Sequence, residues 1–336
     1  MKNIISFLIL AIFAQISLTA STLTIYSYRH YESDQALFDK FTAETGIELE
    51  IVKSKADALL ERLKAEGAKS PADILISSDA GRLHQAKEAG ILQPLKSGFL
   101  EKRVPANLRD PEGYWFGFTQ RARVFAYSPK RVTADELSTY EALADKEWRG
   151  RIVVRSSSNI YNQSLMAGLI AANGRDSATA WARDIRKAMA RPPQGSDRDQ
   201  MRAVAAGLAD VAIVNTYYLG LLKNSDNPKD REVAAQLKIF FPNQDDRGTH
   251  VNVSGGGIIK NSDNVEAAQK FLEFLASDEA QKEFSSATHE YPVVQGLQWS
   301  DTQLEWGSFK ADPIHLSKLG ELNAEAIRTF NRASWE

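Results

Sequence analysis

The chain alternates between stretches of β-type and helical hydrophobic spacing from about residue 23 onward. An apolar run with a period of two begins at Leu23, and the helical pattern after it would be capped by Ser33 and ended by Gly46. Strands alternating with helices at such short intervals indicate parallel βαβ units. Further strands are predicted at 47–52 and 72–76, and further helices at 58–65 and 80–89.

A second α/β series occupies the middle of the chain. It follows a strand at 124–127 and contains strand-like runs at 151–157 and 209–215, after which helical patterns dominate. No long linker separates the two series. The sequence therefore predicts an α/β protein of two doubly wound lobes, joined by crossover strands near 121–127 and 250–254. Strand ends from both lobes would converge on a cleft between them.

Residues 1–20 form a separate segment. Lys2 is followed by an apolar run over 4–16 and by the small residue Ala20, which is the layout of a secretory signal. The run is shorter than the roughly 20 residues that a bilayer span needs. We therefore expect a signal peptide cleaved near Ala20, with an uncleaved anchor or a buried first helix as the alternative.

Composition narrows the function classes. The 336 residues carry a formal net charge of −2 and no cysteine. A near-neutral chain offers no basic surface to displace counterions, so we expect no nucleic-acid partner. Export of a chain of this size without disulfides favours the bacterial periplasm. The sequence contains no nucleophile elbow, HExxH pair or phosphate loop, and an enzyme is not predicted.

Phenols recur at three predicted junctions between a strand and the next helix. In the stretch 211–222, Thr216 would cap a helix whose first two residues are Tyr217 and Tyr218. Ligands bind at such strand ends in open α/β sheets. A single tyrosine there is usually a packing residue, and only the repetition favours a binding site. The other two junctions carry Tyr161, behind Ser158 and Asn159, and Tyr31, preceded by His30.

Several phenols together favour a hard, highly charged cation, because such ions prefer oxygen ligands. A trivalent ion can displace a phenolic proton that otherwise leaves only near pH 10. Fe³⁺ is the abundant biological ion that matches, whereas zinc sites favour histidine, cysteine and carboxylate. Four phenolates would leave the centre with a charge of about −1. Arg121 could balance it directly or hold an anion there; an ion pair that only stabilises the lobes is the alternative.

Six stretches of the sequence resemble a known family and occur in order over nearly the whole mature chain. Together they resemble bacterial ferric-iron-binding periplasmic proteins, the substrate-binding components of iron ABC transporters, and in particular the tyrosine-rich, cyanobacterial-type branch. A tyrosine pair after a strand would be a weak sign alone, but the ordered set is specific. The stretches are IYSYRHYESDQALFDKFTAETGI, PADILISSDAGRLHQAKEAGIL, QRARVFAYSP, RSSSNIYNQSL, DVAIVNTYYLG and HVNVSGGGI.

The resemblance implies a type II periplasmic binding fold that closes around one Fe³⁺. Lobe 1 would comprise 21–121 and 254–290, and lobe 2 would comprise 122–253. A C-terminal helical segment, 291–336, would pack on the lobes. The implied partners are the permease and ATPase subunits of an inner-membrane ABC transporter, and we expect a monomer.

The resemblance also assigns roles to single residues. His30 matches a histidine whose participation in coordination varies within the branch. Arg121 matches an arginine that faces the site as an anion contact or charge balance. The implied metal ligands are Tyr31 from the first lobe and Tyr161, Tyr217 and Tyr218 from the second.

One position departs from the family pattern. In the branch that binds iron together with phosphate, a glutamate follows the strand that reads ADILIS here, whereas this chain has Ser77 and Ser78 before Asp79. We therefore expect no obligatory phosphate, although a synergistic anion such as carbonate could complete the site, and we expect Asp79 to be a peripheral helix cap. Since fold alone does not settle the ligand, the alternative function is binding of a phosphonate, polyamine or thiamine-type solute.

Overall fold

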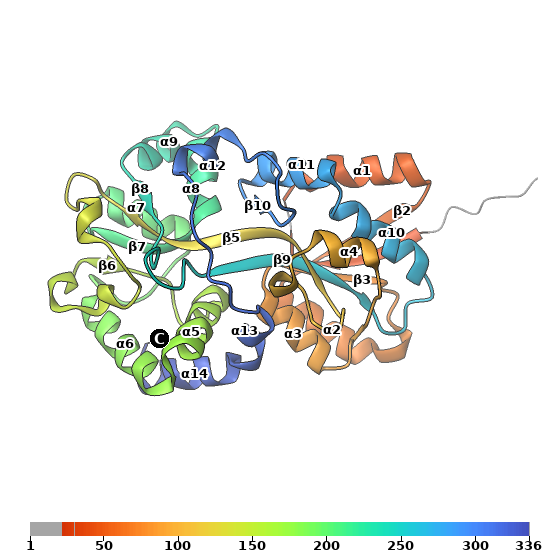
Figure 1. Ribbon diagram of the computed structural model, residues 1–336, viewed down its shortest axis with the longest axis horizontal. Helices are drawn as coiled ribbons and strands as arrows, with labels where there is room; N and C mark the ends of the chain where they lie inside the picture. Colours follow the sequence, from red (N-terminus) through yellow and green to blue (C-terminus); the bar gives the residue numbers. More distant parts are fainter. Residues whose placement is uncertain (1–21, 30, 336) are drawn as a thin grey trace, which may run out of the picture.

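The computed structural model of the protein describes residues 22–29 and 31–335. The expected signal peptide at 1–20 and the candidate ligand His30 lie outside the described residues. Two lobes lie side by side along the long axis of the molecule, and two long strands run between them (Figure 1).

The first lobe is built on parallel strand pairs. Its elements are β1 (Thr22–Ser27), α1 (Asp34–Thr45), β2 (Glu48–Lys53), α2 (Ala56–Glu66), β3 (Ile74–Ser77), α3 (Ala80–Glu88), β4 (Leu92–Gln93) and α4 (Gly98–Arg103). β1 lies between β2 and β3 and pairs parallel with both. α1 begins after Ser33 and ends at Gly46, which takes the left-handed conformation with a φ of 71°. The predicted βαβ order is confirmed, although the Ser33 side chain makes no capping hydrogen bond.

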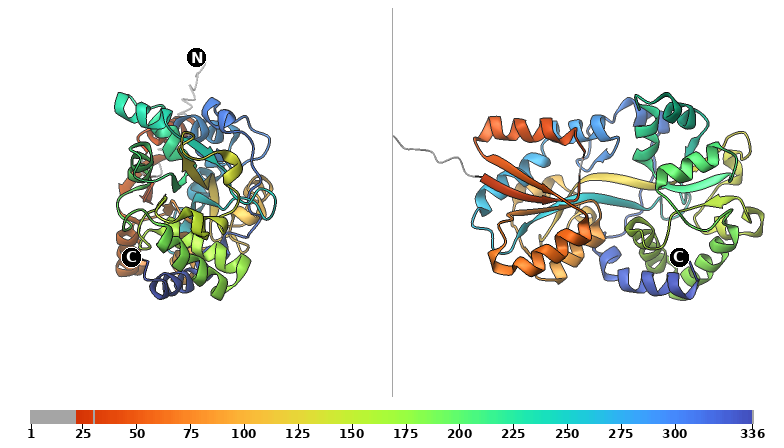
Figure 2. Two further views of the ribbon diagram at one scale, coloured as in Figure 1. Left: turned by 90° about the vertical axis from the view of Figure 1, so that its left-hand side faces the viewer. Right: turned by 180° about the vertical axis from the view of Figure 1, so that it is seen from behind.

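Two strands join the lobes, β5 (Phe116–Tyr127) and β9 (Val251–Ile259). The first half of β5 pairs antiparallel with β9, and its second half pairs antiparallel with β7 (Val211–Asn215) of the second lobe. β9 also pairs antiparallel with β3 of the first lobe. Seen from behind in Figure 2, both strands run through the middle of the molecule. The two crossover strands predicted from the sequence are therefore confirmed, and both are longer than predicted.

The second lobe repeats the α/β arrangement around β7. Its further elements are β6 (Ile152–Val153), α5 (Ile160–Asn173), α6 (Arg175–Ala188), α7 (Asp197–Ala205), α8 (Thr216–Lys223), α9 (Pro228–Ala235) and β8 (Lys238–Phe240). The predicted cap of α8 is wrong by one residue. Asn215 holds the extended cap position, and Thr216 already belongs to the helix. The Thr216 hydroxyl instead accepts a hydrogen bond of 3.4 Å from the backbone N–H of Ala122 on β5.

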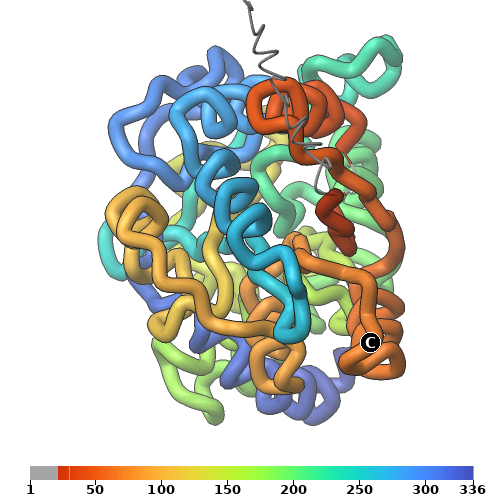
Figure 3. The backbone as a smooth tube through the Cα atoms, turned by 90° about the vertical axis from the view of Figure 1, so that its right-hand side faces the viewer, coloured from red at the N-terminus to blue at the C-terminus, as the bar shows by residue number. Residues whose placement is uncertain are grey.

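The C-terminal part of the chain contacts both lobes. Its elements are α10 (Val265–Leu275), α11 (Asp278–Thr288), β10 (Tyr291–Pro292), α12 (Asp301–Trp306), α13 (Ser317–Glu321) and α14 (Asn323–Arg332). α10 and α11 return to the first lobe, where Figure 3 shows them beside the red N-terminal helix. α13 packs against α3 and α5, and α14 packs on α5 and α6. Within 22–29 and 31–335, no helix has the length and apolarity to cross a bilayer.

Candidate metal centre

Tyr217 and Tyr218 lie in the first turn of α8, directly after the wholly buried strand β7. Their ring centroids are 4.2 Å apart, with an angle of 33° between the ring planes. Tyr217 is only 4% exposed. The buried strand therefore places two neighbouring phenols at its carboxyl end, where ligands bind in open α/β sheets.

Tyr161 reaches the same point from the first turn of α5. The Asn159 side chain caps this helix and accepts a hydrogen bond of 3.1 Å from the Tyr161 backbone N–H. This confirms Asn159 as a cap. The hydroxyl oxygens of Tyr161 and Tyr217 are 3.5 Å apart, close enough for both to bind one ion.

Tyr31 comes from the other lobe, between β1 and α1. Its ring meets that of Tyr217 edge-on, with 6.4 Å between centroids and an angle of 90°. The structure therefore brings together the four tyrosines that the sequence singled out, one from the first lobe and three from the second.

Burial opposes ionisation of the phenols while no metal is bound. It raises the pKa of Tyr31 and of Tyr217 well above the ordinary value, and the Glu290 carboxylate adds to the effect at Tyr31. Burial, together with the nearby Tyr161, also raises the pKa of Tyr218. These three phenols therefore keep their protons at neutral pH, and a cation that binds them must displace those protons.

Arginines surround the phenols and favour their anionic form. The guanidinium carbon of Arg29 lies 4.5 Å from the centroid of the Tyr31 ring. Three more arginines face the other rings, and a positive charge near a phenol lowers the cost of ionising it. They are Arg121 and Arg155, at 5.6 and 5.7 Å from the Tyr161 ring, and Arg198, at 5.7 Å from the Tyr218 ring.

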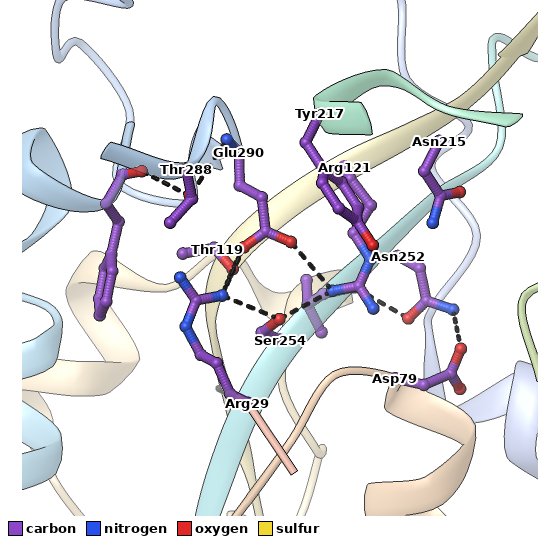
Figure 4. Close-up of polar contacts among 12 residues, drawn as sticks. Arg29, Asp79, Thr119, Arg121, Asn215, Tyr217, Asn252, Ser254, Thr288 and Glu290 are labelled. Atoms are coloured by element: carbon purple, nitrogen blue, oxygen red, sulfur yellow. Dashed lines mark hydrogen bonds and ion pairs between the residues drawn. The ribbon is translucent and has the colours of Figure 1, made fainter. Parts of the chain in front are cut away.

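Arg121 has hydrogen-bond donors to spare. It is 1% exposed, and its Nη1 donates to the Ser254 hydroxyl at 3.0 Å (Figure 4). Its Nε and Nη2 are buried without a partner among the described residues. Buried donors without acceptors are costly, so these two nitrogens suit an acceptor that forms or arrives with the ligand, such as a phenolate or a small anion.

Sequence reasoning missed Glu290, which is 1% exposed and precedes β10. Its Oε1 lies 3.8 Å from Arg121 Nη1, and its Oε2 accepts hydrogen bonds from Arg29 and, at 2.8 Å, from Thr119 (Figure 4). The ion pair considered as the alternative for Arg121 is thus present, but it lies beside the phenols. No local sequence motif marks Glu290. The one available signal was indirect: its partner Arg29 directly precedes the candidate ligands His30 and Tyr31 in the sequence.

Asp79 is the helix cap that the sequence predicted, but it is not peripheral. Its side chain accepts a hydrogen bond of 2.7 Å from the Gly81 backbone N–H at the start of α3. It is fully buried, and the Asn252 amide of β9 donates to it at 2.8 Å. Asp79 is buried because the crossover strand β9 places Asn252 against the start of α3, where its side chain bonds both Asp79 and the Ala80 backbone N–H.

The donor set distinguishes among metals. Within 22–29 and 31–335, no three histidine, aspartate or glutamate side chains form a group suited to a metal ion. The oxygen donors that converge are phenols instead, which suit a hard, highly charged cation and fit zinc poorly.

Two α/β lobes joined by crossover strands, with polar side chains of both lobes meeting between them, define a solute-binding protein. Residues 36–315 match the family described as bacterial extracellular solute-binding protein. The chain belongs to this family, and the fold and resemblance expected from the sequence are confirmed.

Several similar proteins are described as iron uptake or ferric binding proteins. Iron uptake protein A1 of Synechocystis is 50% identical, and the match covers 94% of this chain and 87% of that protein. The Trichodesmium IdiA/FutA structure, in complex with iron and citrate ligands, is 52% identical with a TM-score of 0.92, and the match covers 94% of this chain and all of that one. The ferric binding protein of Campylobacter jejuni is 44% identical with a TM-score of 0.89 and the same coverage.

Proposed function

We propose that this protein captures Fe³⁺ through tyrosine phenolates and delivers it to an inner-membrane ABC permease. The observation that carries the proposal is the meeting of four phenols from two lobes, with the hydroxyls of Tyr161 and Tyr217 at 3.5 Å. The similarity to ferric-binding proteins over nearly the whole chain supports it. The role is capture and transport, without catalysis.

The metal ligands in this proposal are Tyr217, Tyr218 and Tyr161, followed by Tyr31. The adjacent pair binds Fe³⁺ first with Tyr161 nearby, since all three belong to one lobe. Closure then adds Tyr31 and, as a further candidate, His30. Because only the closed form makes all the bonds, binding favours closure.

Arg121 balances the charge of the centre. Four phenolates around Fe³⁺ leave a net charge of about −1, which needs a partner when buried. The unpartnered Nε and Nη2 of Arg121 donate hydrogen bonds to a phenolate directly or hold a synergistic anion such as carbonate against the metal.

The protein works in the periplasm in this proposal, after cleavage of a signal peptide at residues 1–20. It acts as a monomer and meets the permease and ATPase subunits of the transporter at the inner membrane. Lobe 1 comprises 21–121 and 254–290, lobe 2 comprises 122–253, and 291–336 packs on both. A hinge at the crossover strands would let the lobes separate and release the iron.

A ferric titration of the mature protein, followed at visible wavelengths, tests the function. Phenolate bound to Fe³⁺ gives a coloured complex through charge transfer from ligand to metal. We expect a saturable band at one ion per chain. A colourless protein that binds a phosphonate, a polyamine or thiamine instead would refute the proposal.

A further inference from the structure

Arg123 connects one crossover strand to the starts of two helices that carry candidate ligands. It lies on β5 two residues beyond Arg121, so both side chains project from the same face of the strand. Across the antiparallel ladder it faces Asn215, the cap residue of α8. Arg123 is only 2% exposed, and its charged donors therefore need partners inside the protein.

The guanidinium of this arginine donates three hydrogen bonds to three different elements. Nη1 donates to Asp197 Oδ2 of α7 at 2.6 Å and to Asn215 Oδ1 at 3.1 Å. Nη2 donates to Asn162 Oδ1 of α5 at 2.7 Å. Asn162 directly follows Tyr161, and Asn215 stands two residues before Tyr217. One rigid, planar group thus holds the neighbours of both phenols whose hydroxyls lie 3.5 Å apart.

The partners of the guanidinium are themselves bound to the backbone. Asp197 Oδ2 also accepts the backbone N–H of Asn215 at 2.9 Å, where β7 passes into α8. The Asn162 amide donates to the carbonyl oxygens of Arg155 and Ser156 at 2.8 and 3.1 Å, just before α5. Asp197, Asn162 and Asn215 are each at most 3% exposed. A shift of the guanidinium would therefore disturb both helix starts.

We propose that Arg123 is a positioning residue of the metal centre: it holds the starts of α5 and α8 at the separation at which Tyr161 and Tyr217 can bind one ion, before the ion arrives. The inference rests on the ferric-binding function proposed above and deepens it, since it gives the second lobe a preformed half of the site. Side chains that are locked by such hydrogen bonds keep a binding geometry more precisely than free ones.

The alternative role for Arg123 is a buried ion pair with Asp197 that only stabilises the lobe. The geometry favours positioning, because the other two bonds go to Asn162 and Asn215 beside the phenols. A lysine would keep the charge near Asp197, but its ammonium cannot reproduce a planar fork with fixed directions. The phenols would then occupy several arrangements, and iron binding would have to overcome the entropy of ordering them.

The test compares the wild type with Arg123→Lys and Asn162→Ala. The second variant removes the link to α5 and leaves the ion pair between Arg123 and Asp197 in place. Ferric affinity is measured by competition with citrate while the charge-transfer band is followed, at a temperature at which all variants are folded. We expect each variant to lose roughly 10–100-fold in affinity, the range for residues that orient metal ligands, and to show a shifted band.

Two matched variants control for a general loss of stability. Arg131→Lys removes a guanidinium that also makes three hydrogen bonds in the second lobe, to one carboxylate and two backbone carbonyls, none of them on α5 or α8. Gln163→Ala removes a bond from the start of α5 to the Ser157 carbonyl, in the same loop that Asn162 contacts. Both may differ from wild type in thermal midpoint only, and should keep its affinity and band.

Two further measurements show whether Arg123 and Asn162 act together and without metal. In the double variant Arg123→Lys/Asn162→Ala, the loss of affinity should stay close to the larger single loss, whereas independent effects would multiply. Crystal structures of the iron-free Arg123→Lys and Asn162→Ala proteins should show the hydroxyls of Tyr161 and Tyr217 farther apart than 3.5 Å.

A folded Arg123→Lys or Asn162→Ala protein with wild-type affinity and band would overturn the inference. Equal losses in Arg131→Lys or Gln163→Ala would overturn it as well, since they would show that any weakening of the lobe has the same effect. If Arg123→Lys does not fold, Asn162→Ala decides by the same criteria. A wild type that forms no coloured ferric complex would instead refute the proposed function, whereas a coloured wild type with unaffected variants refutes this inference alone.

Discussion

The Ser164 hydroxyl on α5 lies 3.1 and 3.0 Å from the two carboxylate oxygens of Asp79, across the boundary between the lobes. Asp79 caps α3 in the first lobe, and Ser164 lies one turn beyond Tyr161 in the second. Both residues are fully buried. A hydrogen bond to a buried carboxylate therefore joins the helix that carries a candidate metal ligand to the opposite lobe.

Replacing Ser164 with alanine should shift the protein toward an open form. The change removes one hydrogen bond to a charged acceptor, worth about 1.5–3 kcal/mol, and leaves Asp79 with its bonds to Gly81 and Asn252. We expect ferric affinity to fall about tenfold and the radius of gyration of the iron-free protein, measured by X-ray scattering, to rise.

Ser286→Ala is the matched control, because Ser286 is exposed on α11. It should leave both quantities at the wild-type value. A Ser164→Ala protein with unchanged affinity and unchanged scattering would show that this bond does not contribute to closure.

Removing single hydroxyls should separate the ligands by spectrum. Tyr217→Phe and Tyr218→Phe should each lose most of the charge-transfer absorbance, with a loss of ferric affinity beyond the roughly 10–100-fold typical of an outer-shell partner. Tyr31→Phe should weaken binding but keep the colour, because the three phenols of the second lobe remain.

Tyr114→Phe is the control for these variants. Tyr114 lies outside the cluster, with Lys87 over its ring at 4.9 Å, and its loss should change neither band nor affinity. Full ferric affinity in both Tyr217→Phe and Tyr218→Phe would disprove the assignment of the site.

Ferric affinity should fall steeply in acid. Burial raises the pKa of Tyr31, Tyr217 and Tyr218 in the iron-free protein, so these groups are protonated throughout the neutral range and each releases a proton to the solution when it binds iron. Lowering the pH by one unit therefore disfavours binding about tenfold for each proton released.

Proton release can be counted directly in a weakly buffered titration with ferric iron at about pH 6 to 8, where a free phenol is protonated. We expect several protons per ion after correction for hydrolysis of free Fe³⁺. Uptake of protons, or affinity independent of pH, would mean that the phenols do not coordinate as phenolates.

The meeting of the tyrosines could be predicted because they share a local signal. Tyr161 and Tyr217 lie in the first turn of a helix that follows a strand, and Tyr31 lies between a strand and the next helix, so the topology sends all three to strand ends. The helix stop at Gly46 was likewise predictable from one residue, since a left-handed terminus suits glycine.

Glu290 and the inter-lobe role of Asp79 could not be predicted in this way. Glu290 meets Arg29 across 261 residues of sequence, and Asp79 meets Asn252 across 173, so no periodicity or spacing links the partners. The cap of α8 was misplaced for a similar reason. Asn215 and Thr216 are both good caps, and the contact of Thr216 with β5 is a tertiary one.

The glycine run of β9 makes a last, purely structural prediction. A Cβ added at Gly257 would lie 2.2 Å from the carbonyl oxygen of Tyr114 and 3.2 Å from the Leu92 side chain. Gly257 also pairs with Leu75 of β3, so the strand cannot move away from one neighbour without disturbing the other. We expect Gly257→Ala to cost about 2–4 kcal/mol, because the clash is with backbone and not with the end of a flexible side chain.

Thermal unfolding of the iron-free protein measures this cost, and Gly98→Ala is its control. Nothing lies within 4 Å of a Cβ at Gly98, in the first turn of α4, so that change should leave the midpoint equal or slightly raised. Gly257→Ala should lower the midpoint by several degrees, while the folded fraction keeps the wild-type ferric band, since the neighbours of Gly257 are Tyr114, Leu92 and Leu75 and none of them is a candidate ligand. Equal midpoints for the two variants would mean that β9 can shift away from Tyr114 without loss of stability.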